Sequence, residues 1–233
     1  QDRNPDYSLR ESVYTPGVGW TGPTSFSERK RTAALAVNSA GEILEILHAE
    51  ANLYTGQYDD LLARRQVAGS AWGATTSIDG MASPQANLSP AIAAVLDDAG
   101  DATVAWFEDT TNRLWVNRWP SGGSWGTAQE VSATTSSASG DLPPPSLAVN
   151  AGGVVALGWS DNGTGRLRRF VPGSGWTATE VFASGGGAVV DVRVGIDTAG
   201  NVIAVYNENG AVRARRRTAA GTWGAPVDLG TDS

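Results

Sequence analysis

Five tryptophans recur along the chain at intervals of 47 to 53 residues, and no other feature of the sequence restricts the fold as strongly. Each follows a turn that contains glycine, as in PGVGW, SGGSW and PGSGW, and the set is Trp20, Trp72, Trp125, Trp176 and Trp223. A near-constant period with one aromatic per unit is typical of radial β-architectures, because every unit presents the same wedge to its neighbours. The spacing therefore predicts an all-β fold, a β-propeller with five Trp-marked units of about 50 residues.

A second landmark has the same period. In each complete unit an Asn or Asp, followed three residues later by Gly, joins two apolar runs; these residues are Asn38, Asp97, Asn150 and Asp197. An Asn or Asp side chain can hydrogen-bond the backbone two residues further on, and Gly adopts the positive φ that closes a short hairpin. The landmark is therefore predicted to be a turn between two strands.

Between these landmarks each complete unit reads as four short strands, here called A to D. The best-preserved unit contains PSLAVN, VVALGWSD, GRLRRFVP and TATEVF, which combine period-2 alternation with Gly-rich breaks and predict an antiparallel meander. The stretch from Gly41 to Leu53 has helical spacing, yet it aligns with TVAWFED and VIAVYNEN of other units. We therefore expect a strand there, and no α-helix longer than about two turns in the protein.

The strand count predicts one domain, residues 1–233, made of four complete units and an N-terminal half-unit. The half-unit spans residues 1–30, and the complete units span residues 31–82, 83–140, 141–186 and 187–233. The half-unit contains a C-like strand, YSLRESVYT, and a D-like strand after Trp20. Because an open strand edge attracts pairing, we expect the half-unit to complete its blade with another copy of the chain, or to sit beside the fourth complete unit as a thin closing blade.

Composition excludes several classes of site. The chain has no cysteine and one histidine, His48, so it offers no disulfide framework, no thiolate nucleophile and no multi-histidine metal site. No apolar run approaches the roughly 18 residues of a membrane helix, so no membrane span is predicted. No cofactor and no metal ligand is identified.

The charge pattern argues against a nucleic-acid partner. The formal net charge is −7, and phosphate-backbone binding needs clustered cations that release counterions. The one basic run, RARRR from Arg213 to Arg217, alternates between the two faces of a strand and is expected to form a partly paired ladder. The chain begins at Gln1 rather than Met, which indicates either a processed mature terminus or a segment excised from a longer protein; the first alternative leads us to expect a secreted or cell-surface location.

An aromatic, a carboxylate and an arginine recur once per unit. Alignment on the turn glycine puts an aromatic and, two residues later on the same strand face, an acid in three units: Trp106 and Glu108, Trp159 and Asp161, Tyr206 and Glu208. Seven residues before the unit tryptophan lies an arginine, in the same three units Arg118, Arg169 and Arg216. A sugar-binding blade needs this set, because the ring offers an apolar face while the carboxylate accepts from hydroxyl groups and the arginine donates to them.

The same residues also fit a structural role. In the hairpin YNENGAVR a two-residue Asn-Gly turn would place Glu208 opposite Ala211 and Tyr206 opposite Arg213. A repeated salt link that caps each blade would then use the same acids. The five landmark tryptophans are likewise expected to wedge adjacent blades.

The sequence resembles two groups of propellers. The unit PSLAVNAGGVVALGWSD…RLRRFVPGSGWTATEV resembles the sialidase-like propeller repeats of bacteria, in which an Asp-box-type turn precedes a Trp that opens the outer strand. The turns before Trp125, Trp176 and Trp223 carry no Asp-box aspartate, and the resemblance transfers no catalytic residue. Size and blade number are similar to the five-bladed tachylectin-type lectins, which implies one shallow sugar site per blade or blade junction.

The leading hypothesis is therefore a carbohydrate-binding, lectin-like propeller whose partner is a glycan. The alternative is a structural or protein-interaction propeller, as a subunit or fragment of a larger assembly. A glycosidase with two or three carboxylates in an axial pocket is the third hypothesis. Like residues repeat in three of the four complete units, whereas an enzyme concentrates unlike residues in one pocket, so the sequence leans toward a protein that is not an enzyme.

Overall fold

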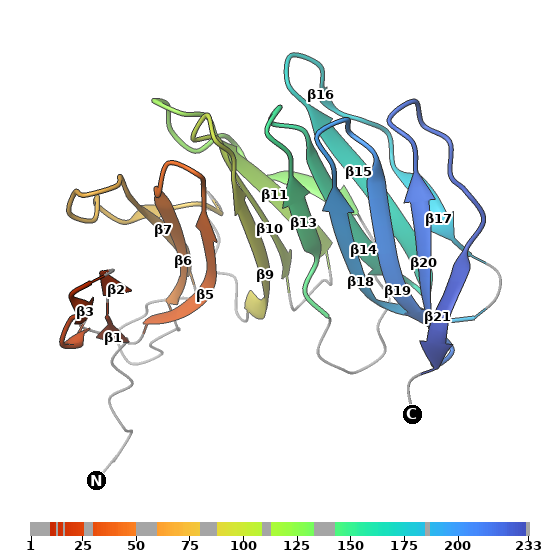
Figure 1. The fold of residues 1–233 in the computed structure, drawn as a ribbon, viewed down its shortest axis with the longest axis horizontal. Helices are drawn as coiled ribbons and strands as arrows, with labels where there is room; N and C mark the ends of the chain where they lie inside the picture. The colour runs from red at the N-terminus through yellow and green to blue at the C-terminus, as the bar shows by residue number, and fades with distance from the viewer. Residues whose placement is uncertain are drawn as a thin grey trace, which may run out of the picture.

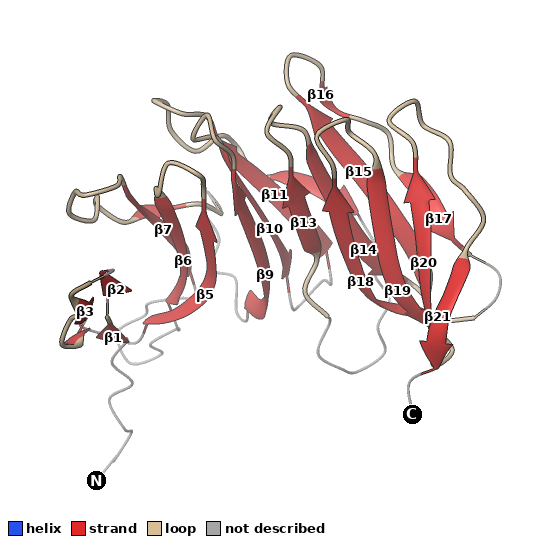
Figure 2. Cartoon of the chain, viewed as in Figure 1, coloured by secondary structure: helices blue, strands red, loops and turns tan. Residues whose placement is uncertain are grey.

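The described part of the chain consists of strands and turns. The computed structural model describes residues 10–12, 14–15, 17–25, 30–49, 60–79, 88–108, 113–132, 143–184 and 187–231. Figure 2 shows that these residues contain strands and loops and no helix. None of them therefore forms a helix that could cross a membrane.

Four antiparallel sheets follow one another along the chain, and each has the strand order A-B-C-D. Blade 1 contains β5(Lys30–Val37), β6(Ile43–Ala49), β7(Asp60–Gln66) and β8(Thr76–Ser77). Blade 2 contains β9(Leu88–Leu96), β10(Ala102–Glu108), β11(Arg113–Trp119) and β12(Gln129–Ser132). Blade 3 contains β13(Ser146–Val149), β14(Val155–Asp161) and β15(Thr164–Val171), with a D strand divided into β16(Gly175–Trp176) and β17(Glu180–Ala183). Blade 4 contains β18(Val189–Ile196), β19(Val202–Glu208), β20(Ala211–Arg217) and β21(Val227–Thr231).

The N-terminal half-unit is a C strand and a D strand, as predicted. Each is divided in two: β1(Arg10–Glu11) and β2(Tyr14–Thr15) make the C strand, and β3(Gly19–Trp20) and β4(Thr24–Ser25) make the D strand. Tyr14 pairs with Trp20 in the same register in which Phe170 pairs with Trp176 in blade 3. The prediction of four complete units plus a half-unit is thus confirmed.

The sheets stand side by side in an arc (Figure 1). The half-unit lies at one end of the arc, next to blade 1, and blade 4 lies at the other end. The expectation that the half-unit sits beside the fourth complete unit as a closing blade is therefore wrong. Its partner in this structure is blade 1, because Glu11 accepts hydrogen bonds from the Trp72 indole nitrogen at 2.8 and 2.9 Å.

Local turn chemistry fixes the hairpins. Asn162 and Gly163, and likewise Asn209 and Gly210, adopt positive φ at the two central positions of two-residue turns. At the A–B turns the Asn or Asp side chain accepts hydrogen bonds from the backbone; Asn150 Oδ1, for example, accepts from the N–H groups of residues 152 and 154 at 3.0 Å. The landmark is therefore a turn, as its sequence predicted.

The stretch with helical spacing is a strand. Residues 43–49 form β6, which pairs with β5 and β7, and residues 50–53 lie outside the described residues. The B strands are the central strands of the blades, and β10 is buried at every position. Because both faces of β6 are covered, its sequence is nearly continuously apolar, and such a run also contains the i, i+3, i+4 apolar spacing of a helix.

The core is a series of layers between successive blades. One layer joins blades 1 and 2, with Leu44, Ile46 and Leu61 on one side and Val104 and Trp106 on the other. The layers between blades 2 and 3 and between blades 3 and 4 repeat this arrangement around Trp159 and Tyr206. Blades 2 and 3 therefore depend on both of their neighbours for burial of their two faces.

Candidate functional site

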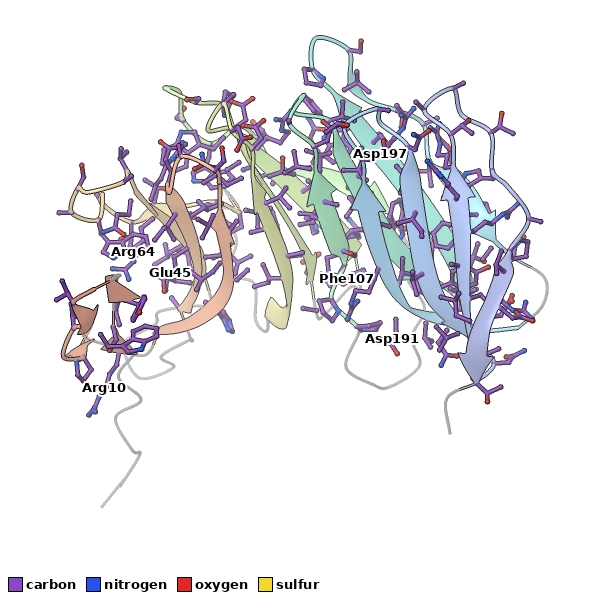
Figure 3. All side chains as sticks on the ribbon, viewed as in Figure 1. Arg10, Glu45, Arg64, Phe107, Asp191 and Asp197 are labelled. Atoms are coloured by element: carbon purple, nitrogen blue, oxygen red, sulfur yellow. The ribbon has the colours of Figure 1, made fainter. Side chains whose placement is uncertain are left out.

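The blades have two chemically different ends. At the B–C end lie the turns between the second and third strands, and Phe107, the penultimate residue of β10, marks this end in Figure 3. Asp197 marks the opposite end, at the A–B turns. The acidic residues Glu108, Asp161 and Glu208 are the last residues of β10, β14 and β19, so the structure places all three at the B–C end.

The predicted aromatic residues are in the core. Trp106, Trp159 and Tyr206 expose 0%, 1% and 2% of their surface, and each belongs to one of the inter-blade layers. A ring that stacks on a pyranose must offer one face to solvent, and these rings offer none. The structure therefore corrects the stacking role that the sequence suggested for these three residues, because the preceding blade covers them.

Two of the three acids beside these rings form the salt link that was the structural alternative. The register places Glu208 opposite Ala211 and Tyr206 opposite Arg213, as the Asn-Gly turn predicted, and Arg213 forms an ion pair with Glu208. In blade 3 Arg166 Nε lies 2.7 Å from Asp161 Oδ2. In blade 2 the acid Glu108 instead accepts a hydrogen bond of 3.3 Å from the indole nitrogen of Trp115.

These ion pairs are part of a charged surface that repeats in three blades. We call it the B–C rim and define it by three sets: Arg113–Glu130 in blade 2, Arg166–Asp161 in blade 3, and Arg213 with Glu208 and Asp228 in blade 4. The arginine side chains of the rim are 32% to 44% exposed. Sequence analysis missed Arg113, Glu130, Arg166 and Asp228. The signal that could have found the two arginines is the cross-strand register, because Arg166 lies opposite Trp159 and Arg113 lies opposite Glu108 on strand C.

The predicted arginines lie at the other end of the blades. Arg118 NH2 is 3.4 Å from Asp101, and Arg216 NH2 is 3.6 Å from Asp197, both acids at A–B turns. The structure does not bring Arg118, Arg169 or Arg216 together with the aromatic–acid pair of its own blade. Each lies an odd number of residues after the rim arginine of its strand, which places it nearer the A–B end and on the opposite face of the sheet.

These arginines connect successive blades. Arg65 of blade 1 lies over the Trp119 ring of blade 2 at 5.6 Å, and Arg118 of blade 2 lies over the Phe170 ring of blade 3 at 3.4 Å. In blade 4 the position of Trp119 and Phe170 is occupied by Arg217. Burial of Arg169 lowers the pKa of its guanidinium, and the positive charge of Arg217 lowers it further. An arginine at this position of strand C therefore makes an inter-blade cation–π contact where the next blade supplies an aromatic ring.

The basic run of blade 4 forms the paired ladder that was predicted. Arg217 makes two hydrogen bonds of 2.7 Å to Glu180 of blade 3, and Trp223 donates to the same carboxylate at 3.0 Å. Arg215 donates to the backbone carbonyl of Phe182, also in blade 3. Trp223, like Trp72, therefore joins its blade to the preceding unit, in agreement with the wedge role expected of the landmark tryptophans.

A small cavity lies where the A–B turns of blades 1 to 3 meet. Its volume is about 220 Å³, and it is lined by Asn38, Asp97, Asp98 and Asn150 with adjoining residues. Asp97 Oδ1 accepts the Asp101 N–H at 2.7 Å, and hydrogen bonds from Ser39 lower the pKa of Asp98. Both carboxylates are thus engaged in turns and blade contacts, and Asp98 is ionised at neutral pH rather than available as a general acid.

Blade 1 has a pair of carboxylates at its B–C end. The hydroxyl oxygen of Ser77 lies 3.0 Å from Asp60 Oδ1 and 2.9 Å from Asp79 Oδ1. Burial, followed by repulsion from Asp79, raises the pKa of Asp60 to about 6. Among the described residues no group of three or more His, Cys, Asp or Glu side chains is arranged to hold a metal ion.

The raised pKa of Asp60 predicts a pH-dependent stability. Because the folded protein binds this proton more tightly than the unfolded chain, whose pKa is about 3.9, the contribution is fully present below about pH 4 and is lost as the pH rises through about 6. Asp60→Asn should match the wild-type Tm at pH 4 and exceed it at pH 7. Thermal unfolding between these values checks this, with Asp191→Asn as the control, and parallel curves for Asp60→Asn and wild type would contradict it.

The comparisons with known proteins identify the fold. No protein-family model matches the sequence, and the search of characterised proteins finds no match. Among solved structures, a Hadza microbial sialidase, Hz136, is similar with a TM-score of 0.51 and 15% identity over 84% of this chain. The chain spans 46% of that sialidase, about half its length.

Two further structures cover more of their own length. A protein of unknown function from Dyadobacter fermentans has a TM-score of 0.54 and 14% identity, over 88% of this chain and 70% of its own. The lectin of the fungus Aleuria aurantia, a six-bladed β-propeller with a mode of fucose recognition, has a TM-score of 0.53 and 16% identity, over 98% of this chain and 73% of its own. The fold is that of a β-propeller. Likeness at this level of identity is shared by lectins and sialidases and does not specify function.

Proposed function

We propose that the protein is a carbohydrate-binding, lectin-like β-propeller whose shallow sites repeat along the B–C rim. The observation that carries this proposal is the recurrence of a half-exposed arginine beside a carboxylate in three successive blades. Arg113 NH1 lies 3.1 Å from Glu130, Arg166 lies 2.7 Å from Asp161, and Arg213 Nε lies 2.8 Å from Asp228. The same chemistry is thus presented three times at one end of the molecule.

These pairs have the polarity that a saccharide requires. A carboxylate accepts hydrogen bonds from neighbouring hydroxyls, and the guanidinium donates in a rigid fork to hydroxyl or carboxylate oxygens. The rings of Trp106, Trp159 and Tyr206 are buried and take no part in the proposed contact with the sugar. Three weak sites on one rigid arc would gain affinity on a surface that carries many glycans.

The fold comparison supports this proposal without specifying the sugar. A fungal lectin whose fold covers 98% of this chain recognises fucose, and a structurally similar protein is a sialidase. We extend to this chain the class of ligand, a glycan, and with it a secreted or cell-surface location. Neither the individual sugar nor an enzymatic activity is part of the proposal.

A structural or protein-interaction propeller is the second candidate, and a specific observation favours it. The aromatic residues of the repeated set are fully buried, and each acid beside them already has a partner in its own blade. A protein that used this set solely to hold blades together would need nothing more. The lectin proposal predicts that removal of the rim arginines weakens glycan binding. The structural candidate predicts that no glycan is bound at these residues.

The experiment is glycan binding with rim variants. The wild-type protein is applied to immobilised fucosylated, sialylated and galactosylated oligosaccharides, and Arg213→Ala and the double variant Arg166→Ala/Arg213→Ala are then compared on the glycans retained. We expect a partial loss from the single variant and a loss of about tenfold or more in avidity from the double variant, because two of three sites are removed. Asp161 and Glu208 are 7% and 6% exposed and lose their cation in these variants, so Tm is measured for each variant and avidity is compared at a temperature at which all of them are folded.

The matched control is Arg193→Ala, which removes an exposed arginine from β18 whose guanidinium donates to the neighbouring Val192 carbonyl. It should bind as the wild type does. Retention of no glycan by the wild-type protein, or equal avidity of wild type and double variant, would refute the proposal and favour the structural candidate.

A further inference from the structure

Blade 4 has one covered face and one open face. Along its B strand β19, buried and less buried positions alternate, with Ile203 on the open side, whereas β10 is buried at every position. The covered side carries Val202, Ala204 and Tyr206, which pack against blade 3. The other side of β19 therefore faces away from the remaining blades, at the end of the arc in Figure 1.

The open face is built from the same residue types as the covered ones. Ile203 is 47% exposed and pairs with Arg216, as Leu44 pairs with Arg65 and Ala156 with Arg169, and both Leu44 and Ala156 are 0% exposed. We call this surface the terminal face and define it by Val190, Ile203, Arg216, Val227 and Leu229.

The D strand of blade 4 also exposes an apolar residue that is buried in other blades. Ala214 pairs with Val227, and Leu229, two residues further on, is 58% exposed. Phe182 has the same place in blade 3, and Ile78 has it in blade 1, where the next blade buries them to 0% and 1%. The terminal face thus presents apolar side chains at the positions that a following blade covers elsewhere, and a contiguous exposed apolar surface of this kind marks an interaction site.

The half-unit has the complementary open face. Tyr14 and Trp20 form a tilted ring pair with centroids 5.4 Å apart, as Trp119 and Trp125 do at 5.5 Å. In blades 2 and 3 the corresponding ring pair faces the preceding blade, whose arginine lies over its first ring. In the half-unit Tyr14 and Trp20 are 55% and 71% exposed, and their shared register with Phe170 and Trp176 assigns them to the side away from blade 1.

One charged contact would connect the two open faces. Arg216 is at the strand position of Arg65 and Arg118, and those two arginines lie over Trp119 and Phe170 of the following blade. Tyr14 is at the strand position of Phe170. The Arg216 side chain is 68% exposed, so a half-unit packed on the terminal face would receive it over the Tyr14 ring.

We propose that the terminal face of one molecule binds the half-unit of a second copy of this chain, in a head-to-tail contact that continues the blade-to-blade packing. A second copy is the occupant because the two faces lie at opposite ends of one arc (Figure 1), while their side chains match those of the observed layers. Such a contact is heterologous: each molecule uses two different surfaces, and association propagates to a closed ring or an open chain.

The experiment is the mass of the 233-residue chain in solution, measured by light scattering over a concentration series. The wild type should exceed the mass of one chain at about 100 μM, a concentration chosen for a contact of micromolar strength. Leu229→Asp and Trp20→Asp should each remain monomeric, because each disables one of the two faces. Both replaced side chains are exposed, so both variants should fold, which circular dichroism verifies. Val67→Asp, a charge placed at an exposed apolar residue outside either face, is the matched control and should associate as the wild type does.

Mixing the two disabled variants tests the head-to-tail arrangement itself. Leu229→Asp retains an intact half-unit, and Trp20→Asp retains an intact terminal face, so an equimolar mixture should form a complex of twice the mass of one chain and stop there. A wild-type protein that stays monomeric, a Leu229→Asp variant that associates like the wild type, or a mixture that remains monomeric would each overturn the proposal.

Discussion

Replacing Trp159 with alanine is expected to lower the free energy of unfolding by about 3–5 kcal/mol, as for other large buried aromatic residues. The side chain is 1% exposed and fills the layer between blades 2 and 3, where it packs with Phe107 and Leu114. The change leaves a cavity that neither blade can close alone. Denaturant unfolding measures the loss, and it should appear as a lower midpoint with an unchanged slope.

Trp159→Phe is the matched variant for this prediction. It keeps an aromatic ring in the layer and removes the indole N–H, which has no hydrogen-bond partner among the described residues. We expect a loss well below that of the alanine variant, because most of the apolar contact remains and no buried donor is left unpaired. An alanine variant within about 1 kcal/mol of wild type would show instead that the ring is not part of the core.

Arg64→Ala is expected to lower the free energy of unfolding by about 3–5 kcal/mol, the range for removing one partner of a buried ion pair. Arg64 Nε donates to Glu45 at 2.5 Å, both side chains are 7% exposed, and the guanidinium lies over the Trp72 ring at 4.1 Å. Figure 3 shows Arg64 and Glu45 on blade 1, on the side of the half-unit. Loss of the arginine leaves Glu45 buried without this cation and also removes a charge 3.7 Å from Glu11.

The control for this second prediction transplants the equivalent pair of blade 2. Glu45 pairs with Arg64 as Val104 pairs with Asn117, so the double variant Glu45→Val/Arg64→Asn gives blade 1 a pair that blade 2 already accommodates. We expect it to recover most of the stability lost in Arg64→Ala, since a buried ion pair is often replaceable by groups that fit. A double variant as unstable as Arg64→Ala would mean that the charges themselves hold the half-unit on blade 1.

The repeat could be predicted because its signals are local. The Asn/Asp turns, the Asn-Gly hairpin at Asn209 and the glycine-bounded strands each depend on a few consecutive residues, and these residues determine their own backbone geometry. Register follows from the turns, which is why the pairing of Glu208 with Ala211 was accessible. Ile43–Ala49 was assigned to a strand by its place in the repeat, against its own periodicity.

The candidate site could not be predicted to the same degree, because exposure is a property of neighbouring blades. The sequence placed Trp159 and Asp161 on one face of one strand, and it could not show that blade 2 covers the ring while the acid pairs with Arg166. Of the rim arginines, the register predicted the place of Arg213 but not the share of its side chain that stays exposed.

The sequence by itself determined the number of units, the class of fold, the strand order within a blade and the incomplete first unit. Only the tertiary structure decided which face of each blade is covered, which arginine meets which acid, and that the half-unit rests on blade 1 through Glu11 and Trp72. The physical reason is range. Backbone geometry is selected within a few residues, whereas burial and ion pairing depend on surfaces that come together from units about 50 residues apart.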